Sequence, residues 1–320
     1  MTNKWWHQPS LEMRKQGKSS RQIAKDLFGK SSMKSSVNYF FNKWDAENNY
    51  GVENTGVVKQ GKVNYLFFDL ETSPERTLTF GRFKQNIGDT QVLSYSHILT
   101  VAWAFNDGEV KSSKLSHKDI ENEDDLTAII DLVEAINKAD VIVTFNGVKF
   151  DLKYLKTRML KWGLPPLKPV KHIDLFLQAK KHFRFPSNSM NNICKYLGYS
   201  ELKTSTDFDL WKRCINYKDK QDCETALTEM EMYNRQDIVV TRNLFKQIQG
   251  WTTGINVGTI LNSKENVNET IRCPKCGSDD INAIDSELQV GQSMFSLYRC
   301  GDCRGVSRIN AKGSVLLDVV

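Results

Sequence analysis

The chain has 320 residues, of which 40% are hydrophobic, 10% aromatic and 26% charged. This composition is typical of a soluble globular protein of two or three domains, and it excludes disorder over most of the length. No run approaches the ~18 consecutive apolar residues of a membrane helix, and residues 1–10 lack the apolar core of a secretion signal. Because the seven cysteines are an odd number, we expect a chain of the reducing cytoplasm.

The net charge of +6 is unevenly distributed. Residues 1–50 hold nine Lys and Arg against four Asp and Glu, whereas residues 51–270 hold 29 against 28 and residues 271–320 hold six of each. Nearly all of the excess lies in the first fifty residues, which favours a polyanionic partner for that part of the chain.

Residues 1–48 are expected to form three short helices. Ser19 and Gln22 have the spacing of a capping box at the start of one helix. A preceding helix is expected over 11–16 and a following one over 31–44. The last helix would have a single apolar face, formed by Met33, Val37, Phe40, Phe41 and Trp44.

This basic three-helix segment resembles a helix-turn-helix DNA-binding module. By that resemblance, the last helix would present Lys34 and Asn38 to DNA. A small helical domain that packs against protein is the alternative.

Residues 63–250 form the largest predicted domain, between linkers at 48–62 and 251–270. Apolar runs followed by helical periodicity predict an α/β sheet with crossover connections. Strands are predicted at 63–70, 99–105 and 141–145, and helices at 126–136 and 152–162.

Two carboxylates end the first of these strands. Asp69 and Glu71 are two residues apart, so they point to the same face of a strand. Because two neighbouring anions repel each other, the pair indicates a site for a divalent cation, with oxygen ligands that suit Mg²⁺ or Mn²⁺. Two other Asp-x-Glu pairs, Asp222/Glu224 and Asp285/Glu287, follow no apolar strand and are expected on the solvated surface.

Two further acidic positions lie later in the domain. Asp151 opens a predicted helix shortly after an apolar strand that ends in Asn-Gly, where the helix dipole favours a carboxylate. Tyr233 and Asp237 are four residues apart in a predicted helix and therefore share a face. Taken singly, each has an ordinary surface or helix-start interpretation.

In this order, the three motifs resemble the DEDD superfamily of 3′–5′ exonucleases, the DnaQ-like nucleases on a ribonuclease H-like fold. The sequences of these motifs are similar to those in the exonuclease domains of B-family DNA polymerases and in YprB-like nucleases. The histidine subclass has His where this chain has Met232, whereas the tyrosine subclass has Tyr at the place of Tyr233, so the chain resembles the DEDDy subclass. The resemblance implies an α/β fold with a mixed sheet and flanking helices.

The resemblance also implies a two-metal mechanism. Asp69, Glu71, Asp151 and Asp237 would hold two Mg²⁺ or Mn²⁺ ions, and Tyr233 would orient the attacking water. The implied function is 3′–5′ hydrolysis of DNA at single-stranded or frayed ends, in prokaryotic or phage replication, repair or recombination. A separate DNA polymerase or replication protein is a further expected partner. An RNA exonuclease, a structure-specific endonuclease and an inactive DNA-binding adaptor remain alternatives.

Substrate contacts are less clearly indicated. The region around and after Asp151 is rich in basic residues, which either contact phosphates or form a solvated helix face: Lys149, Lys153, Lys156, Arg158, Lys161, Lys168 and Lys171. Phe80, Phe83 and Tyr95 are expected in the core, with base stacking as the alternative. The stretch 172–175 resembles a segment of related nucleases and receives no catalytic role.

Residues 271–320 contain two C-x-x-C pairs, Cys273/Cys276 and Cys300/Cys303, with 23 residues between them. The pattern resembles a zinc ribbon, in which four thiolates close a tetrahedral structural site. The ribbon would bind either nucleic acid or protein. The other cysteines, at 194, 214 and 223, are expected to be buried thiols.

Overall fold

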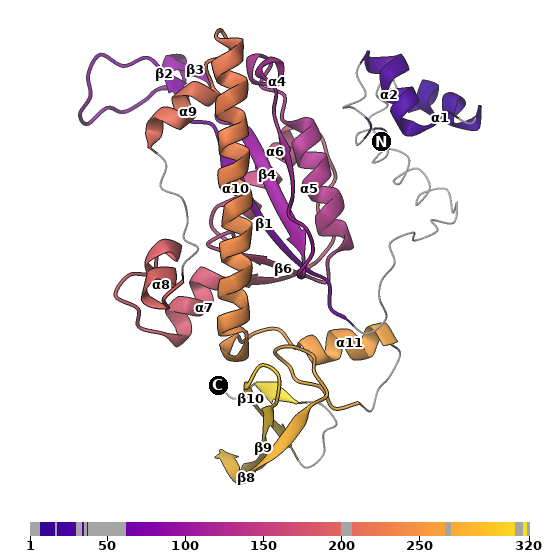
Figure 1. The fold of residues 1–320 in the computed structure, drawn as a ribbon, viewed down its shortest axis with the longest axis vertical. Coiled ribbons are helices and arrows are strands. Elements are labelled where there is room, and N and C mark those ends of the chain that lie inside the picture. Colours follow the sequence, from indigo (N-terminus) through magenta and orange to yellow (C-terminus); the bar gives the residue numbers. More distant parts are fainter. Residues whose placement is uncertain are drawn as a thin grey trace.

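The structure is a computed structural model. It describes residues 7–16, 18–29, 34, 37, 62–199, 207–265, 270–310 and 316–318. Figure 1 shows a central sheet with a long helix in front of it and a smaller β-unit below.

The central sheet is mixed and has five strands in the order β5-β4-β1-β6-β7. On one side of β1 the pairing is antiparallel, from β1 to β4 and from β4 to β5; on the other side β6 and β7 run parallel to it. The strands are β1 (Tyr65–Thr72), β4 (Ile98–Phe105), β5 (Lys111–Lys114), β6 (Val141–Thr144) and β7 (Lys171–Asp174). The expected mixed α/β fold is confirmed, and three of these strands correspond to the predicted ones.

The two faces of β1 belong to different cores. Leu66, Phe68 and Leu70 lie in one buried cluster with α5 (Leu126–Lys138) and α6 (Asp151–Lys161). Tyr65 and Phe67 point the other way and pack on Phe245 in the second half of α10, with ring centroids 5.1 and 5.5 Å away. This alternation follows from the two-residue period of a strand.

Helix α10 (Lys220–Ile248) has 29 residues and runs along the sheet in front of β1 (Figure 1). The remaining elements of this part are short: β2 (Arg76–Thr77), η2 (Asp89–Gln91), β3 (Val92–Ser94), α4 (His117–Glu121), α7 (Leu175–His182), α8 (Met190–Tyr196), α9 (Phe208–Cys214), η3 (Gln249–Trp251) and α11 (Val257–Glu265). No helix in the described ranges combines the length and the apolar character needed to cross a bilayer.

The first turns of α10 correct one sequence-based expectation. Asp222 and Glu224 are half-buried and are not part of a solvated surface. Asp222 accepts a hydrogen bond from Arg213 Nε on α9 at 2.9 Å, and Glu224 accepts from the backbone N–H of His117 on α4, also at 2.9 Å. The two carboxylates therefore hold neighbouring helices against α10. Asp285 and Glu287 are exposed, as expected.

The N-terminal segment contains α1 (His7–Lys15) and α2 (Ser20–Phe28). The predicted capping box is confirmed: Gln22 N–H donates to Ser19 Oγ at 3.4 Å, and Ser19 N–H donates to Gln22 Oε1 at 3.0 Å. Of the predicted third helix, only Lys34 and Val37 are described; both are helical, and Val37 is buried while Lys34 is exposed. Asn38 lies outside the described residues.

The C-terminal unit is a four-stranded sheet of order β11-β10-β9-β8. Its strands are β8 (Ile281–Val290), β9 (Ser293–Cys300), β10 (Val306–Asn310) and β11 (Leu317–Asp318). The long β8–β9 hairpin takes up most of the 23 residues between Cys276 and Cys300.

Candidate active site

Strand β1 carries Asp69 and Glu71 to the α10 side of the sheet. Both have the same parity as Tyr65 and Phe67, whose rings pack on α10. Asp69 lies opposite Ala102 of β4 in the antiparallel register, so the neighbour on that face is small. The apolar part of the strand thus fixes where the two carboxylates emerge.

Asp237 reaches the same place from α10. Its side chain is only 1% exposed. Carboxylate oxygens of Asp69, Glu71 and Asp237 all lie within 4.8 Å of one another. We call these three residues the carboxylate cluster; it joins the first and third predicted motifs.

Asp151 lies beside this cluster, but its carboxylate oxygens are not within 4.8 Å of all three of the others. It opens α6, is buried, and its Oδ1 accepts a hydrogen bond from the backbone N–H of Leu70 at 3.2 Å. Leu70 stands between Asp69 and Glu71, so Asp151 is attached to the strand segment that carries both of them.

A residue without a predicted role organises the loop before Asp151. Asp174, at the end of β7, accepts the N–H groups of Asn146 at 2.9 Å and Val148 at 3.0 Å. It also caps α7 by accepting from Phe176 N–H at 3.0 Å. Asp174 is therefore a positioning residue for the second motif, and the family-like stretch 172–175 was the available signal for it.

Asn234 is a second residue that the sequence reasoning missed. It is fully buried on α10, and its Nδ2 donates to Asp69 Oδ2 at 2.6 Å. It stands three residues before Asp237, so the two share a helix face. That spacing was a usable signal, but nothing in the sequence identified Asp69 as the partner.

Tyr233 is buried one turn before Asp237, and its ring meets Trp211 edge-on with centroids 6.3 Å apart. Met232, at the position of the histidine in the other subclass, is 67% exposed. The helix thus turns position 233 inward and position 232 toward solvent.

The histidines with described side chains have their contacts elsewhere. His97 contacts Ser73, His117 contacts Glu224, His172 contacts Thr144 and His182 contacts Thr253. Burial lowers the pKa of His97 and of His172 below the ordinary value, which favours their neutral forms. None of these four rings belongs to the carboxylate cluster.

The donor set of the carboxylate cluster fits divalent cations. Three carboxylates whose oxygens lie within 4.8 Å of one another repel when ionised, and burial of Asp237 removes the water that would solvate its charge. A hard cation relieves both penalties, and carboxylate oxygens are the ligands that Mg²⁺ and Mn²⁺ prefer.

The structure separates the basic residues near α6 into two kinds. Lys149, Lys153 and Lys156 are exposed and available to a polyanion. Arg158 is not: it is buried and pairs with Asp125, with Nε 2.6 Å from Oδ2 and Nη2 2.9 Å from Oδ1. A phosphate contact by Arg158 is therefore excluded in this structure.

The core assignment of three aromatic residues is wrong. Phe80, Phe83 and Tyr95 are all exposed. Phe80 and Phe83 lie in a segment that folds as a separate hairpin outside the central sheet, and Tyr95 directly follows that hairpin.

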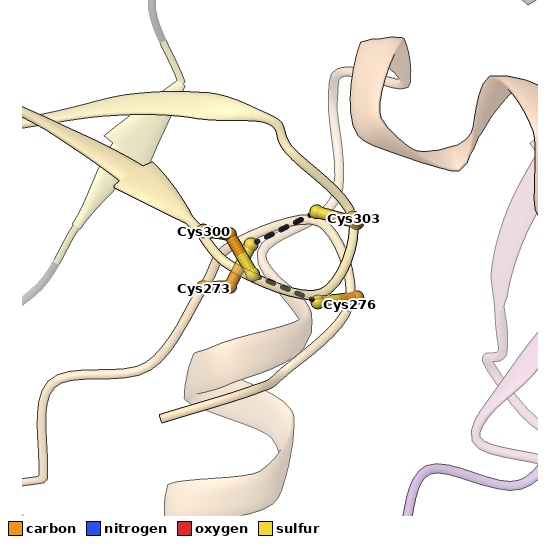
Figure 2. A group of neighbouring side chains, drawn as sticks. All are labelled: Cys273, Cys276, Cys300 and Cys303. Carbon is orange, nitrogen blue, oxygen red and sulfur yellow. Dashed lines mark hydrogen bonds between the residues drawn. The ribbon is translucent and has the colours of Figure 1, made fainter. Parts of the chain in front are cut away.

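The four predicted cysteine ligands come together at the base of the C-terminal unit (Figure 2). Cys273 Sγ lies 3.6 Å from Cys303 Sγ, and Cys276 Sγ lies 3.6 Å from Cys300 Sγ. These separations are too long for disulfides. Four thiolates at ~2.3 Å from a tetrahedral zinc ion lie about 3.8 Å apart, so this cysteine cluster fits zinc.

Hydrogen bonds from Cys276 and Cys303 lower the pKa of Cys273, and the same hydrogen bonds raise the pKa of Cys276 and of Cys303. The remaining cysteines behave as expected. Cys194, Cys214 and Cys223 are buried free thiols, and burial raises the pKa of Cys214 to about 12.

The cysteine cluster is joined to the end of α10. Lys275, buried between the first two cysteines, donates from Nζ to Thr252 O at 2.6 Å. A Cβ added to Gly250 would lie 2.1 Å from Cys303 O. Only glycine permits this close approach of the two backbones.

Comparisons with known proteins give a family match for the central part of the chain. A sequence model described as RNase_H superfamily matches residues 89–249, which include Asp151, Tyr233 and Asp237. A PolC-type DNA polymerase III of Ureaplasma parvum serovar 3 is 27% identical over 141 residues, covering 41% of this chain and 9% of that protein. A family B DNA polymerase of the archaeon Pyrobaculum calidifontis has 16% identity and a TM-score of 0.42, with 59% of this chain and 25% of that chain covered. The chain spans only a small part of the length of either polymerase.

Proposed function

The chain belongs to the RNase_H superfamily, and from that premise we propose that it is a metal-dependent nuclease, more specifically a 3′–5′ exonuclease of DNA in the DEDDy subclass. The observation that carries the proposal is the carboxylate cluster, in which Asp69 and Glu71 of β1 lie within 4.8 Å of Asp237 of α10. Three acids so close together, one of them buried, are unfavourable without cations and suited to two of them.

The residues have separate roles in this proposal. Asp69, Glu71 and Asp237, with Asp151 beside them, hold two Mg²⁺ or Mn²⁺ ions. When bound, such ions lower the pKa of water and neutralise the charge that develops on the phosphate oxygens. Asn234 fixes the rotamer of Asp69 through the 2.6 Å hydrogen bond to Oδ2.

Tyr233 orients the attacking water. Its position supports this role, because it is buried one helical turn from Asp237 while Met232 faces solvent. A phenol with an ordinary pKa of about 10 is a weak base at neutral pH, so orientation and not proton removal is the role that fits.

The two terminal segments would be accessory modules. Residues 1–48 would be the helix-turn-helix-like DNA-binding part, residues 63–250 the nuclease domain and residues 271–320 a zinc ribbon with one structural zinc. The cysteine cluster, with sulfur separations of 3.6 Å, supports the last assignment. A separate DNA polymerase or replication protein is a proposed partner, in replication, repair or recombination.

One assay tests the reaction. Single-stranded DNA, duplex DNA and RNA, each labelled at the 3′ or the 5′ end, are incubated with Mg²⁺ or Mn²⁺, and the products are separated by length. We expect stepwise loss from the 3′ end of DNA and no activity in Asp69→Ala. Faster shortening of RNA than of DNA would favour an RNA exonuclease, and an internal cut would favour an endonuclease. Inactivity on every substrate would favour a DNA-binding adaptor.

A further inference from the structure

A hairpin arm projects from the molecule directly after the first carboxylate motif. It comprises residues 76–94, in which β2 pairs with β3 as a two-stranded sheet of its own. Figure 1 shows its loop extending away from the body beside α9. We define this segment as the aromatic arm.

The tip of the arm exposes large apolar side chains. Phe80 is fully exposed and Phe83 is 85% exposed. Every residue from 78 to 90 is exposed, so neither ring contributes to a core. Single exposed hydrophobic residues are common, but two phenylalanines three positions apart on a projecting loop mark an interaction surface.

The tip is also basic. Arg76, Arg82 and Lys84 lie in the arm, and the stretch from residue 76 to 88 contains no Asp or Glu. Arg82 stands between the two phenylalanines in the sequence Phe80-Gly81-Arg82-Phe83-Lys84. Cations alternating with flat apolar rings match a polyanion that also offers flat apolar faces, which describes single-stranded nucleic acid.

The loop of the arm is held by its own hydrogen bonds. Leu78 N–H donates to Gln91 O and Gln91 Nε2 donates to Leu78 O, both at 2.9 Å. Nearer the tip, Gln85 Nε2 donates to Phe83 O at 2.8 Å. These bonds give the exposed rings a defined support, so less ordering entropy is lost when a ligand binds.

The base of the arm is fastened to the elements of the site. Ser73, two residues after Glu71, donates its backbone N–H to His97 O at 2.8 Å. Tyr154 of α6, the helix that Asp151 opens, donates from its hydroxyl to Ser96 Oγ at 2.5 Å. The residues that flank the arm on both sides are therefore held to each other and to α6, just past the end of β1 where Glu71 emerges.

We propose that the aromatic arm binds single-stranded nucleic acid, with Phe80 and Phe83 stacking on bases and Arg82 and Lys84 contacting phosphates. The proposal rests on the proposed nuclease function, because the arm would bind the same strand whose 3′ end is hydrolysed, at nucleotides upstream of that end. The span from Glu71 to Phe80 is nine residues, at most about 30 Å when extended. The exposed rings therefore lie no farther from the carboxylates than this limit, a span that several nucleotides of one strand can cover.

The test measures binding apart from catalysis. Full-length protein is titrated, at fixed salt and without added Mg²⁺, Mn²⁺ or chelator, into a fluorescein-labelled single-stranded DNA of about 16 nucleotides, and the Kd is read from anisotropy. Hydrolysis is prevented by leaving out the divalent cations, and the absence of a chelator leaves the proposed zinc in place. We expect F80A/F83A to weaken binding at least tenfold, on the order of tenfold for each stacked base. F80L/F83L, which keeps apolar bulk without an aromatic face, should bind as weakly as F80A/F83A. F80W/F83W, which keeps two aromatic faces, should bind with the wild-type Kd.

Two controls make the result specific. Met294→Ala, which removes an exposed apolar side chain on β9, should leave Kd unchanged. An oligonucleotide of equal length with abasic positions should bind the wild type more weakly and bind F80A/F83A no more weakly than the normal strand. Because both phenylalanines are exposed, all variants should keep the wild-type Tm.

The outcomes separate this proposal from the nuclease proposal. Wild-type affinity in F80A/F83A, or full rescue by leucine, would overturn base stacking by the arm and would point to a protein partner for these rings. If the wild type binds the strand through the arm but hydrolyses nothing with Mg²⁺ or Mn²⁺, the arm stands and the nuclease proposal fails.

Discussion

The carboxylate cluster and the cysteine cluster both gather ligands of one kind, but they are built in opposite ways. The carboxylates sit on a sheet and a helix that have large apolar cores on both faces. The cysteines lie on two tight loops between the end of α10 and a β-ribbon whose residues are mostly exposed. Of the described apolar residues in 270–310, few besides the cysteines are buried. The first site is therefore carried by a fold with its own apolar cores, whereas the second unit would depend on the proposed zinc for a core.

Loss of zinc should produce the largest effect. Cys273→Ser should unfold the C-terminal unit, because a structural zinc contributes on the order of 10 kcal/mol to a small domain. Hydrogen exchange should show lost protection in β8, β9 and β10 and retained protection in the central sheet. Strong chelation of the wild type should do the same, and Ser296→Ala, at an exposed position of β9, is the control. If the C-terminal unit keeps its hydrogen-exchange protection after chelation, its fold does not depend on zinc.

Removal of a carboxylate should abolish activity without unfolding. Asp237→Asn is expected to lower kcat about a thousandfold, or about 4 kcal/mol of transition-state stabilisation. Its Tm should be unchanged or higher, because the change removes repulsion within the cluster. Glu229→Gln, at an exposed carboxylate of the same helix paired with Arg213, should change neither kcat nor Tm. Wild-type turnover in Asp237→Asn would remove Asp237 from the site.

Tyr233→Phe should have a smaller kinetic effect, because it removes a hydroxyl and keeps the ring that packs on Trp211. We expect a fall in kcat of about tenfold to a hundredfold, the range of a misplaced reactant, with KM and Tm unchanged. Met232→Leu, at the exposed neighbouring position, should be neutral. An unchanged rate in Tyr233→Phe would show that its hydroxyl does not act on the attacking water.

Gly250 lies where the end of α10 packs against the cysteine cluster, and a substitution there should weaken that packing. Gly250→Ala would force a Cβ to within 2.1 Å of Cys303 O, and relief of such overpacking costs about 1–3 kcal/mol. We expect a lower Tm for the C-terminal unit with little change in the sheet. Gly88→Ala is the matched control, because its Cβ would have no neighbour closer than 3.7 Å. An equal Tm for both variants would mean that the two parts do not pack as described.

The mildest effect is expected at Asn234. Asn234→Ala removes the 2.6 Å hydrogen bond to Asp69 Oδ2, and loss of such an outer contact lowers metal affinity about tenfold. Mn²⁺ binding measured by calorimetry should weaken, and activity should recover when the metal is raised. Gln221→Ala, exposed on α10, should bind Mn²⁺ like the wild type. If affinity stays the same while kcat falls, Asn234 acts on the substrate and not on Asp69.

Features that depend on short spacings were predictable. The capping box of Ser19 and Gln22 and the two C-x-x-C loops involve neighbours in sequence, so their geometry follows from local backbone rules. The shared face of Asp69 and Glu71 follows from strand parity in the same way. The strands β5 and β7 were missed because their sequences, Lys111–Lys114 and Lys171–Asp174, are short and polar.

Partners far apart in the sequence were decided by the tertiary structure. Asn234 meets Asp69 across 165 positions, and no local period predicts such a pairing. Arg158 looks like one more basic residue of α6, but its register points it at Asp125 in the interior. Phe80 and Phe83 look like core residues, but the arm leaves the sheet before they can be covered.

By itself, the sequence determined which carboxylates and cysteines of this protein are chemically suited to metals and which local element carries each of them. Only the tertiary structure decided that β1 and α10 bring three of these carboxylates within 4.8 Å and that the aromatic arm stays outside the core. The physical reason is that side-chain chemistry and local periodicity are properties of neighbouring residues. Convergence and exposure depend instead on how the whole chain buries its apolar faces.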